Sequence, residues 1–169
     1  RLPDPELAEL GLALGADVPV FVHGQAAWAE GVGERLTPLE LPEPVYLLVR
    51  PVATVSTAEV FKAPELTRDS PAITIPGFLL TGGRNDCEPV VRRRFPAVAE
   101  ALDWLEGFAP ARLTGTGSCV YAATPDEAHA RAALASLPRR WTGYVVRGLN
   151  RSPLAARRRL EQSGAAPSR

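Results

Sequence analysis

The segment Leu41-Pro42-Glu43-Pro44 most constrains how this chain of 169 residues can fold. Two prolines separated by one residue can neither continue a helix nor donate hydrogen bonds inside a sheet. A segment of this kind is stiff and extended, as many linkers between domains are. We therefore expect a domain boundary here, with residues 1–41 on one side and residues 45–154 on the other.

The residues before this boundary predict a helix followed by extended chain. The helical pattern runs from the start of the sequence and stops at Gly15. The apolar run 18–22 is predicted to be a strand, because Pro19 biases the residue before it toward an extended backbone. Residues 25–41 are predicted to be a second extended stretch, so that this part forms a helix and a β-hairpin.

Asp17 is the first candidate for chemistry. It lies between the predicted helix and the predicted strand, with apolar residues on both sides. Partial burial there would make its carboxylate a useful proton acceptor for a substrate hydroxyl. The alternative is a turn aspartate that hydrogen-bonds its own backbone. These few residues leave both interpretations open.

The residues after the boundary predict an α+β domain. The expected order is a strand, a short helix, an irregular excursion, two helices, a strand, a helix and a strand. The three strands are 45–49, 119–123 and 141–149. The short helix starts at Ser56, and the excursion spans residues 63–83. Helices on one face of a small, largely antiparallel sheet satisfy this order. We predict a ferredoxin-like sandwich, with a disordered tail over residues 155–169.

A glycine-rich loop, Gly115-Thr116-Gly117-Ser118, is the second candidate for chemistry. Two glycines that alternate with hydroxyl residues let backbone N–H groups converge on a phosphate. The loop lacks the Gly-Lys-Ser/Thr of a Walker loop and the third glycine of a dinucleotide fingerprint. A tight turn before a core strand is the alternative interpretation.

Composition excludes several classes of function. Nineteen basic and nineteen acidic residues cancel, so no overall field attracts nucleic acid or an anionic membrane. Cys87 and Cys119 lie far apart, as do His23 and His129, which argues against a zinc site and for free thiols in a reducing compartment. The sequence shows neither a membrane span nor a signal peptide pattern, and we predict a cytoplasmic protein.

Four segments together resemble one family. They are Leu-Gly-Ala-Asp-Val-Pro-Val-Phe-Val (14–22), Ala-Glu-Gly-Val-Gly-Glu (29–34), Asn-Asp-Cys-Glu-Pro (85–89) and Arg-Leu-Thr-Gly-Thr-Gly-Ser-Cys-Val-Tyr-Ala (112–122). The chain resembles the C-terminal portion of kinases of the GHMP superfamily that phosphorylate a cytidylylated sugar alcohol in the non-mevalonate isoprenoid pathway. The helix and hairpin before the linker would then be the end of an N-terminal kinase domain.

The resemblance implies roles for particular residues. Asp17 matches the catalytic aspartate, which would accept or orient the proton of the attacking hydroxyl. Phe61 matches an aromatic residue that stacks on the cytosine ring, and Thr57 lines the same pocket. Residues Gly115, Thr116, Gly117 and Ser118 match a loop near the phosphate site. ATP with Mg²⁺ would be the phosphoryl donor.

The sequence also departs from the family. The glycine-rich ATP loop and the catalytic lysine of the N-terminal domain have no counterpart here, Lys62 being the only lysine. Ala58 stands where the family usually has proline. Because phosphoryl transfer depends on positioning and charge neutralisation, we predict that these residues alone are not an active kinase and that their apolar faces self-associate. The alternative is a non-catalytic ferredoxin-like binding or regulatory module.

Overall fold

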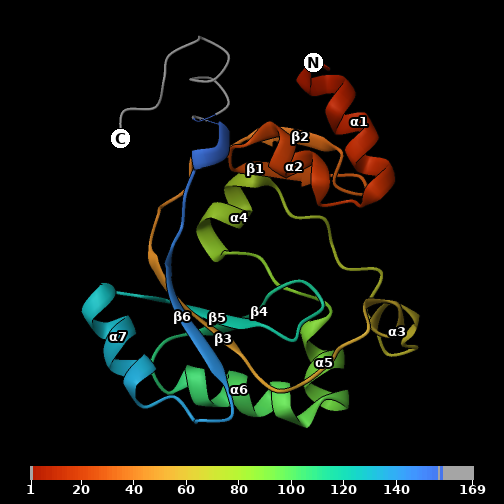
Figure 1. Cartoon of the computed structure of the whole chain (residues 1–169). Coiled ribbons are helices and arrows are strands. Elements are labelled where there is room, and N and C mark those ends of the chain that lie inside the picture. Colours follow the sequence, from red (N-terminus) through yellow and green to blue (C-terminus); the bar gives the residue numbers. More distant parts are fainter. Residues whose placement is uncertain (1, 156, 158–169) are drawn as a thin grey trace. The chain divides into compact units, whose positions relative to one another are not determined.

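A computed structural model describes residues 2–155 and residue 157 (Figure 1). The described part of the chain divides into two compact units. The first, the sheet domain, comprises residues 44–148. The second, the N-terminal unit, comprises residues 2–43 with 149–155 and 157.

The sheet domain is built on four antiparallel strands. They are β3 (Val45–Arg50), β4 (Ala111–Leu113), β5 (Val120–Thr124) and β6 (Thr142–Arg147), and their order in the sheet is β4-β5-β3-β6. The central strand β3 pairs Leu47 with Ala122 on one side and with Val145 on the other. The α+β prediction and its three strands are confirmed. The short edge strand β4 was not predicted.

Three helices cover one face of this sheet: α5 (Glu88–Arg94), α6 (Pro96–Glu106) and α7 (Glu127–Ala135) (Figure 1). Because side chains alternate along a strand, Leu47 and Val49 point toward these helices and are fully buried, while Tyr46 and Leu48 belong to the opposite face. These helices add buried aliphatic side chains to the core: Val90, Val91, Val98, Ala101, Leu102, Leu105, Ala130 and Ala133.

Two further helices lie in the segment between β3 and α5. Helix α3 (Thr57–Lys62) begins as predicted, because the Ser56 hydroxyl accepts a hydrogen bond from the Glu59 N–H at 3.3 Å. Helix α4 (Ile75–Thr81) lies inside the excursion that we expected to have little regular structure, and that expectation is wrong. Thr74 caps α4 and Pro76 suits its first turn, so its start signals were present in a stretch rich in breakers.

The N-terminal unit contains α1 (Asp4–Leu14), α2 (Val18–His23) and a two-stranded antiparallel hairpin, β1 (Ala27–Glu30) with β2 (Arg35–Pro38). The predicted first helix is confirmed. A hairpin is present, but both of its strands lie within the predicted extended stretch 25–41. The predicted strand over residues 18–22 is wrong, because this run is helix α2. Pro19 lies in the first turn of α2, where a missing N–H costs nothing, and this preference outweighs its bias on the residue before it.

A glycine allows α1 and α2 to lie close together. A Cβ atom on Gly11 would lie 2.7 Å from Cγ1 of Val18, which is closer than two carbon atoms can approach. Gly15 ends α1, and its carbonyl accepts a hydrogen bond from the Val18 N–H at 3.1 Å. The helical pattern therefore resumes after a turn of three residues.

The two units meet in sequence within the proline-rich segment, after Glu43. The sheet domain ends at Gly148, and Asn150 is hydrogen-bonded to Leu41 inside the N-terminal unit. That residues 1–41 are the end of another domain, and that 45–154 form one domain, stay predictions. The predicted disordered tail, 155–169, lies outside the described residues except for 155 and 157. Over the described ranges, no helix is both long enough and apolar enough to cross a bilayer.

Candidate functional site

Two of the predicted site segments meet within the sheet domain. Thr57 is the first residue of α3, and Thr116 lies in the loop that connects β4 to β5. Their Oγ1 atoms are 2.8 Å apart and share a hydrogen bond, although 59 positions separate the two residues. The structure thus joins the predicted substrate-binding helix to the predicted phosphate loop.

The glycine-rich loop is the turn of a hairpin at the edge of the sheet. The Thr114 N–H donates to the Cys119 carbonyl at 3.1 Å, and the Gly117 N–H donates to the Thr114 carbonyl at 2.9 Å. Gly115 and Gly117 have φ values of +55° and +89°, a region that other residues rarely adopt. A Cβ atom on Gly115 would face open space. The loop is therefore a tight turn whose backbone is open to a ligand at Gly115.

Phe61 lies on α3 one turn after Thr57. Phe61 is 57% exposed as a residue, whereas the preceding residue, Val60, is fully buried and anchors the helix in the core. Arg68 Nη2 donates a hydrogen bond to the Phe61 carbonyl at 2.7 Å and fixes the end of the helix. An exposed ring on a well-held helix is a suitable surface for stacking on a flat ligand.

Two side chains that were not predicted as site residues, Asn85 and Glu88, hold the loop through hydrogen bonds to its backbone and to the end of β4. Asn85 Nδ2 donates to the carbonyl oxygens of Leu113 and Gly115, at 3.1 and 2.7 Å. Glu88 Oε2 accepts a hydrogen bond from the Leu113 N–H at 3.0 Å. Asn85 Oδ1 also accepts a hydrogen bond at 3.0 Å from the N–H of Cys87, the N-cap residue of α5. Such a local bond uses only the oxygen of the amide, so the two N–H donors that it leaves over were the available signal.

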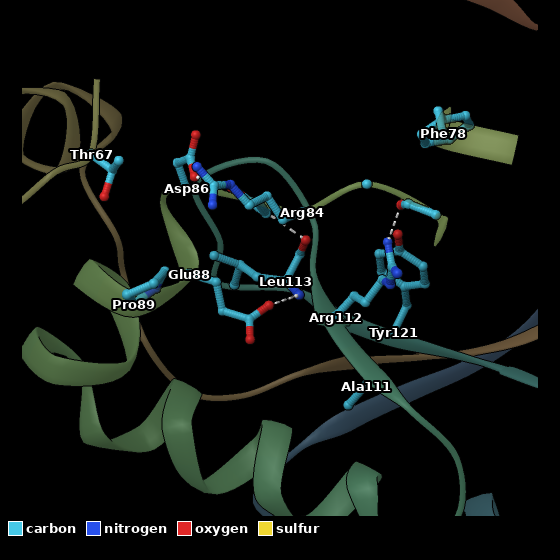
Figure 2. Close-up of a pocket in the computed structure, with 13 residues that line it drawn as sticks. Thr67, Phe78, Arg84, Asp86, Glu88, Pro89, Ala111, Arg112, Leu113 and Tyr121 are labelled. Atoms are coloured by element: carbon cyan, nitrogen blue, oxygen red, sulfur yellow. Dashed lines mark hydrogen bonds and ion pairs between the residues drawn. The ribbon is translucent and has the colours of Figure 1, made fainter. Parts of the chain in front are cut away.

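A cavity of about 580 Å³ adjoins these supports (Figure 2). Figure 2 shows Glu88 reaching the N–H of Leu113 and, on the opposite side, Arg112 beside Tyr121. Arg112 donates to the Gly82 carbonyl. The cavity lies on the face of the sheet away from α6, because Tyr121 and Phe78 of α4 both line it. It offers aromatic and charged surfaces next to the loop.

The two carboxylates in the cavity wall, Asp86 and Glu88, are compensated. Arg84 Nε lies 2.9 Å from Asp86 Oδ1, and Asp86 Oδ2 accepts a hydrogen bond from Ser70 at 2.6 Å. Glu88 Oε1 lies 3.4 Å from Nε of Arg92. Each carboxylate therefore has a cationic partner, which favours a structural role for both.

The two cysteines are free thiols, as predicted, and both are half-buried. Burial raises the pKa of the Cys87 thiol, so this side chain stays protonated at neutral pH. Within the residues that the structure describes, no three His, Cys, Asp or Glu side chains cluster as ligands for a metal ion. Over the described residues, a Mg²⁺ ion would therefore need ligands besides a cluster of protein side chains, such as the phosphates of ATP.

Asp17 belongs to the N-terminal unit and occupies the N-cap position of α2. Its side chain is exposed, so the predicted partial burial is wrong. The turn alternative also fails in detail, because in the described structure the carboxylate makes no hydrogen bond that caps the helix. The corner that carries Asp17 lies between the helices α1 and α2, where a helix and a strand were predicted to meet.

Comparison with protein families gives a match within the sheet domain. Residues 77–143 match the family "GHMP kinases C terminal". This region contains the loop, its Asn85 and Glu88 supports, and helices α5 to α7.

Curated relatives match almost the whole chain. The chain is 62% identical over 149 residues to a 4-diphosphocytidyl-2-C-methyl-D-erythritol kinase of Nitrosococcus oceani, covering 88% of this chain and 53% of the relative. It is 60% identical over 160 residues to the protein of that name from Alkalilimnicola ehrlichii, covering 95% and 55%. The chain thus spans about half the length of the curated relatives it matches.

A solved structure agrees with these matches. It is a crystal structure of 4-(cytidine 5'-diphospho)-2C-methyl-D-erythritol kinase, 29% identical, with a TM-score of 0.68 over 85% of this chain and 57% of the other. The α+β architecture of the sheet domain is therefore shared with that kinase. Taken together, the matches show that residues 77–143 belong to the family of GHMP kinase C-terminal domains, and that the chain as a whole is similar to the C-terminal portion of the 4-diphosphocytidyl-2-C-methyl-D-erythritol kinases.

Proposed function

We propose that this chain is the substrate-side part of a kinase that transfers phosphate from ATP to a hydroxyl of 4-diphosphocytidyl-2-C-methyl-D-erythritol, in the non-mevalonate isoprenoid pathway. The relatives that bear this name, at up to 62% identity, support the assignment. The observation that carries it is the hydrogen bond between Thr57 and Thr116, since it joins a helix with an exposed aromatic ring to an open glycine-rich loop.

Each candidate residue has a chemical task in this proposal. Asp17 accepts or orients the proton of the attacking hydroxyl. Phe61 stacks on the cytosine ring, and Thr57 lines the same pocket. The loop 115–118 lies beside the phosphate groups, and its backbone N–H groups face phosphate oxygens, except that of Gly117, which is bonded to the Thr114 carbonyl. ATP supplies the transferred phosphoryl group when bound.

The proposal includes an expected loss of activity in the isolated chain. Phosphoryl transfer relies on groups that hold the nucleotide and neutralise charge. The sequence has no glycine-rich ATP loop of the family type, and its single lysine, Lys62, lies next to Phe61. We expect these 169 residues to show no phosphate transfer to the cytidylylated substrate. Normal turnover by the chain alone would contradict this.

A chimera tests the function directly. In it, this chain replaces the matched segment of the Nitrosococcus oceani kinase, and phosphate transfer to 4-diphosphocytidyl-2-C-methyl-D-erythritol is measured. We expect turnover within about tenfold of that of the parent kinase. At 62% identity over the segment, the side chains of this chain should still pack against the rest of the Nitrosococcus oceani kinase. A folded chimera without activity would contradict the proposal. If the chain then still bound cytidine diphosphate, the binding-module alternative would be favoured.

Phe61 offers a sharper test in the same chimera. Loss of one stacked base costs about 1–3 kcal/mol, so Phe61→Ala is expected to raise KM for the cytidylylated substrate about tenfold or more. Phe108→Ala is the matched control, because Phe108 is also exposed, at 49%, and its ring packs against Trp104 instead. Equal changes in KM for the two variants would contradict a stacking role for Phe61.

A further inference from the structure

Asn85 uses every hydrogen-bonding group of its side-chain amide. Its Oδ1 accepts from the Cys87 N–H at 3.0 Å, and its Nδ2 donates to the carbonyls of Leu113 and Gly115 at 3.1 and 2.7 Å. One half-buried side chain thus links the start of α5 to the glycine-rich loop.

The loop needs such support because it begins at the edge of the sheet. Leu113 is the last residue of β4, which pairs only with β5 in the described sheet. The N–H of Leu113 donates to Glu88 and its carbonyl accepts from Asn85. Side chains from the start of α5 therefore take the place of a neighbouring strand, and they do so at the point where the loop departs.

The bond to Gly115 also fixes the direction of a peptide group. In a trans peptide the carbonyl and the following N–H point in opposite directions. Because the Gly115 carbonyl is held toward Asn85, the N–H of Thr116 is turned to the opposite side. The Thr116 side chain is fixed independently by its bond to Thr57, and space is open beside Gly115.

We propose that Asn85 is a positioning residue for phosphate transfer: it orients the Gly115–Thr116 peptide so that the Thr116 N–H faces a phosphate group of the bound ligand. The inference rests on the function proposed above and adds a residue to that site. Asn85 acts through the loop and makes no contact with substrate itself.

Asn85→Asp separates the two tasks of this side chain. Aspartate has the same shape and still accepts the Cys87 N–H, but it cannot donate to the two loop carbonyls. Asn150→Asp is the matched control, since Asn150 accepts from the Leu41 N–H at 2.8 Å and donates to the Leu41 carbonyl at 2.7 Å. Asn85→Ala removes the donors without adding charge beside Asp86, and it serves where the aspartate variant fails to fold.

Steady-state kinetics of the chimera provide the first measurement. A loop that Asn85 no longer holds in position is expected to lower kcat about 10- to 100-fold, as small errors of positioning do. KM for the cytidylylated substrate should change less than about threefold, since stacking on Phe61 is intact. Asn150→Asp should leave both constants unchanged. A wild-type kcat for Asn85→Asp and Asn85→Ala would overturn the inference.

Loop dynamics in the 169-residue chain provide the second measurement. Backbone amide order parameters at Gly115 and Thr116 are expected to fall from about 0.85 to below about 0.6 in both Asn85 variants, and to stay unchanged in Asn150→Asp. Unchanged values in the Asn85 variants would overturn the inference even if the chimera were inactive. An inactive wild-type chimera with normal loop order would instead count against the proposed function.

Discussion

The sheet domain and the N-terminal unit differ in how they bury apolar surface. In the described structure the buried aliphatic and aromatic side chains belong to the sheet domain, from Leu47 to Trp141, with the exception of Pro19. In the N-terminal unit, Leu14 is 85% exposed and Phe21 is 75% exposed. One unit has a core of its own, and the other presents much of its apolar surface to solvent.

The residues to which a function is proposed differ in the same way. Thr57, Phe61 and the loop are held by a closed core, whereas Asp17 lies on a unit whose helices lack one. Exposed apolar surface of this kind promotes association. We therefore expect the chain to self-associate in solution, and a strictly monomeric species by light scattering would contradict this.

The largest expected effect concerns Asp17, the N-cap residue of α2 in the N-terminal unit. Asp17→Asn should reduce phosphate transfer by the chimera about 10²- to 10⁴-fold, the usual contribution of a general base. Its free energy of unfolding should change by less than about 0.5 kcal/mol, because the carboxylate is exposed and caps no N–H in the described structure. Retained activity would exclude Asp17 as the proton acceptor.

The second effect tests the core directly. Leu47→Ala removes a fully buried side chain from the central strand and should lower the free energy of unfolding by about 2–5 kcal/mol. Phe21→Ala in the N-terminal unit removes a larger side chain, yet the cost should be within about 0.5 kcal/mol. Urea denaturation of both variants gives the comparison. A similar cost at both positions would show that the N-terminal unit does bury Phe21.

The third effect is smaller and reverses the pattern of Asp17. Asp126 is the N-cap of α7, and its Oδ1 accepts a hydrogen bond from the His129 N–H at 2.9 Å. Asp126→Ala should cost about 1 kcal/mol of stability and leave kinase activity of the chimera unchanged. Thermal unfolding together with the transfer assay checks both expectations. A clear loss of phosphate transfer at a temperature where the variant is still folded would contradict them.

The smallest effect compares two carboxylates of low pKa. In the sheet domain, hydrogen bonds from Arg94, at 2.6 and 2.8 Å, lower the pKa of Glu65 to about 2. In the N-terminal unit, backbone N–H groups lower the pKa of Glu34, including the Val32 N–H at 2.7 Å. Because salt screens exposed charge pairs, adding salt should raise the pKa of Glu65 more than that of Glu34. NMR titration at two ionic strengths measures both.

The lowered pKa of Glu65 determines how stability changes with pH. The Glu65 contribution to stability is fully present above the ordinary carboxyl pKa and is lost as the pH falls toward about 2. Arg94→Gln should remove this part of the acid dependence of urea denaturation. An unchanged acid dependence in that variant would contradict the assignment of the shift to Arg94.

The sequence predicted most of the sheet domain because its elements carry local signals. The apolar run at Val45–Val49 and the cap at Ser56 each have one structural solution. The α2 helix was predicted wrongly because six residues around Pro19 satisfy a strand and a first helical turn equally well. Helix α4 was missed because its caps lie among breakers.

The site was predictable in part, for a similar reason. The loop and α3 were identified separately from glycine spacing and a capping pattern, but no local pattern predicts that Thr57 and Thr116 meet across 59 positions. The hydrogen bonds from Asn85 to the loop also join distant segments. In the sequence, only the two N–H donors of its amide, which a local bond to the oxygen leaves over, indicated that such bonds form. Contacts between distant segments are set by packing, which one sequence does not display.

The glycine-rich loop closes a hairpin whose outer strand, β4, has only three residues. Short edge strands open locally at a free energy below that of global unfolding. On warming, the loop should therefore lose its arrangement while the helices beneath the sheet are still folded. Phosphate transfer would then fail at a temperature lower than the one at which far-UV circular dichroism records melting.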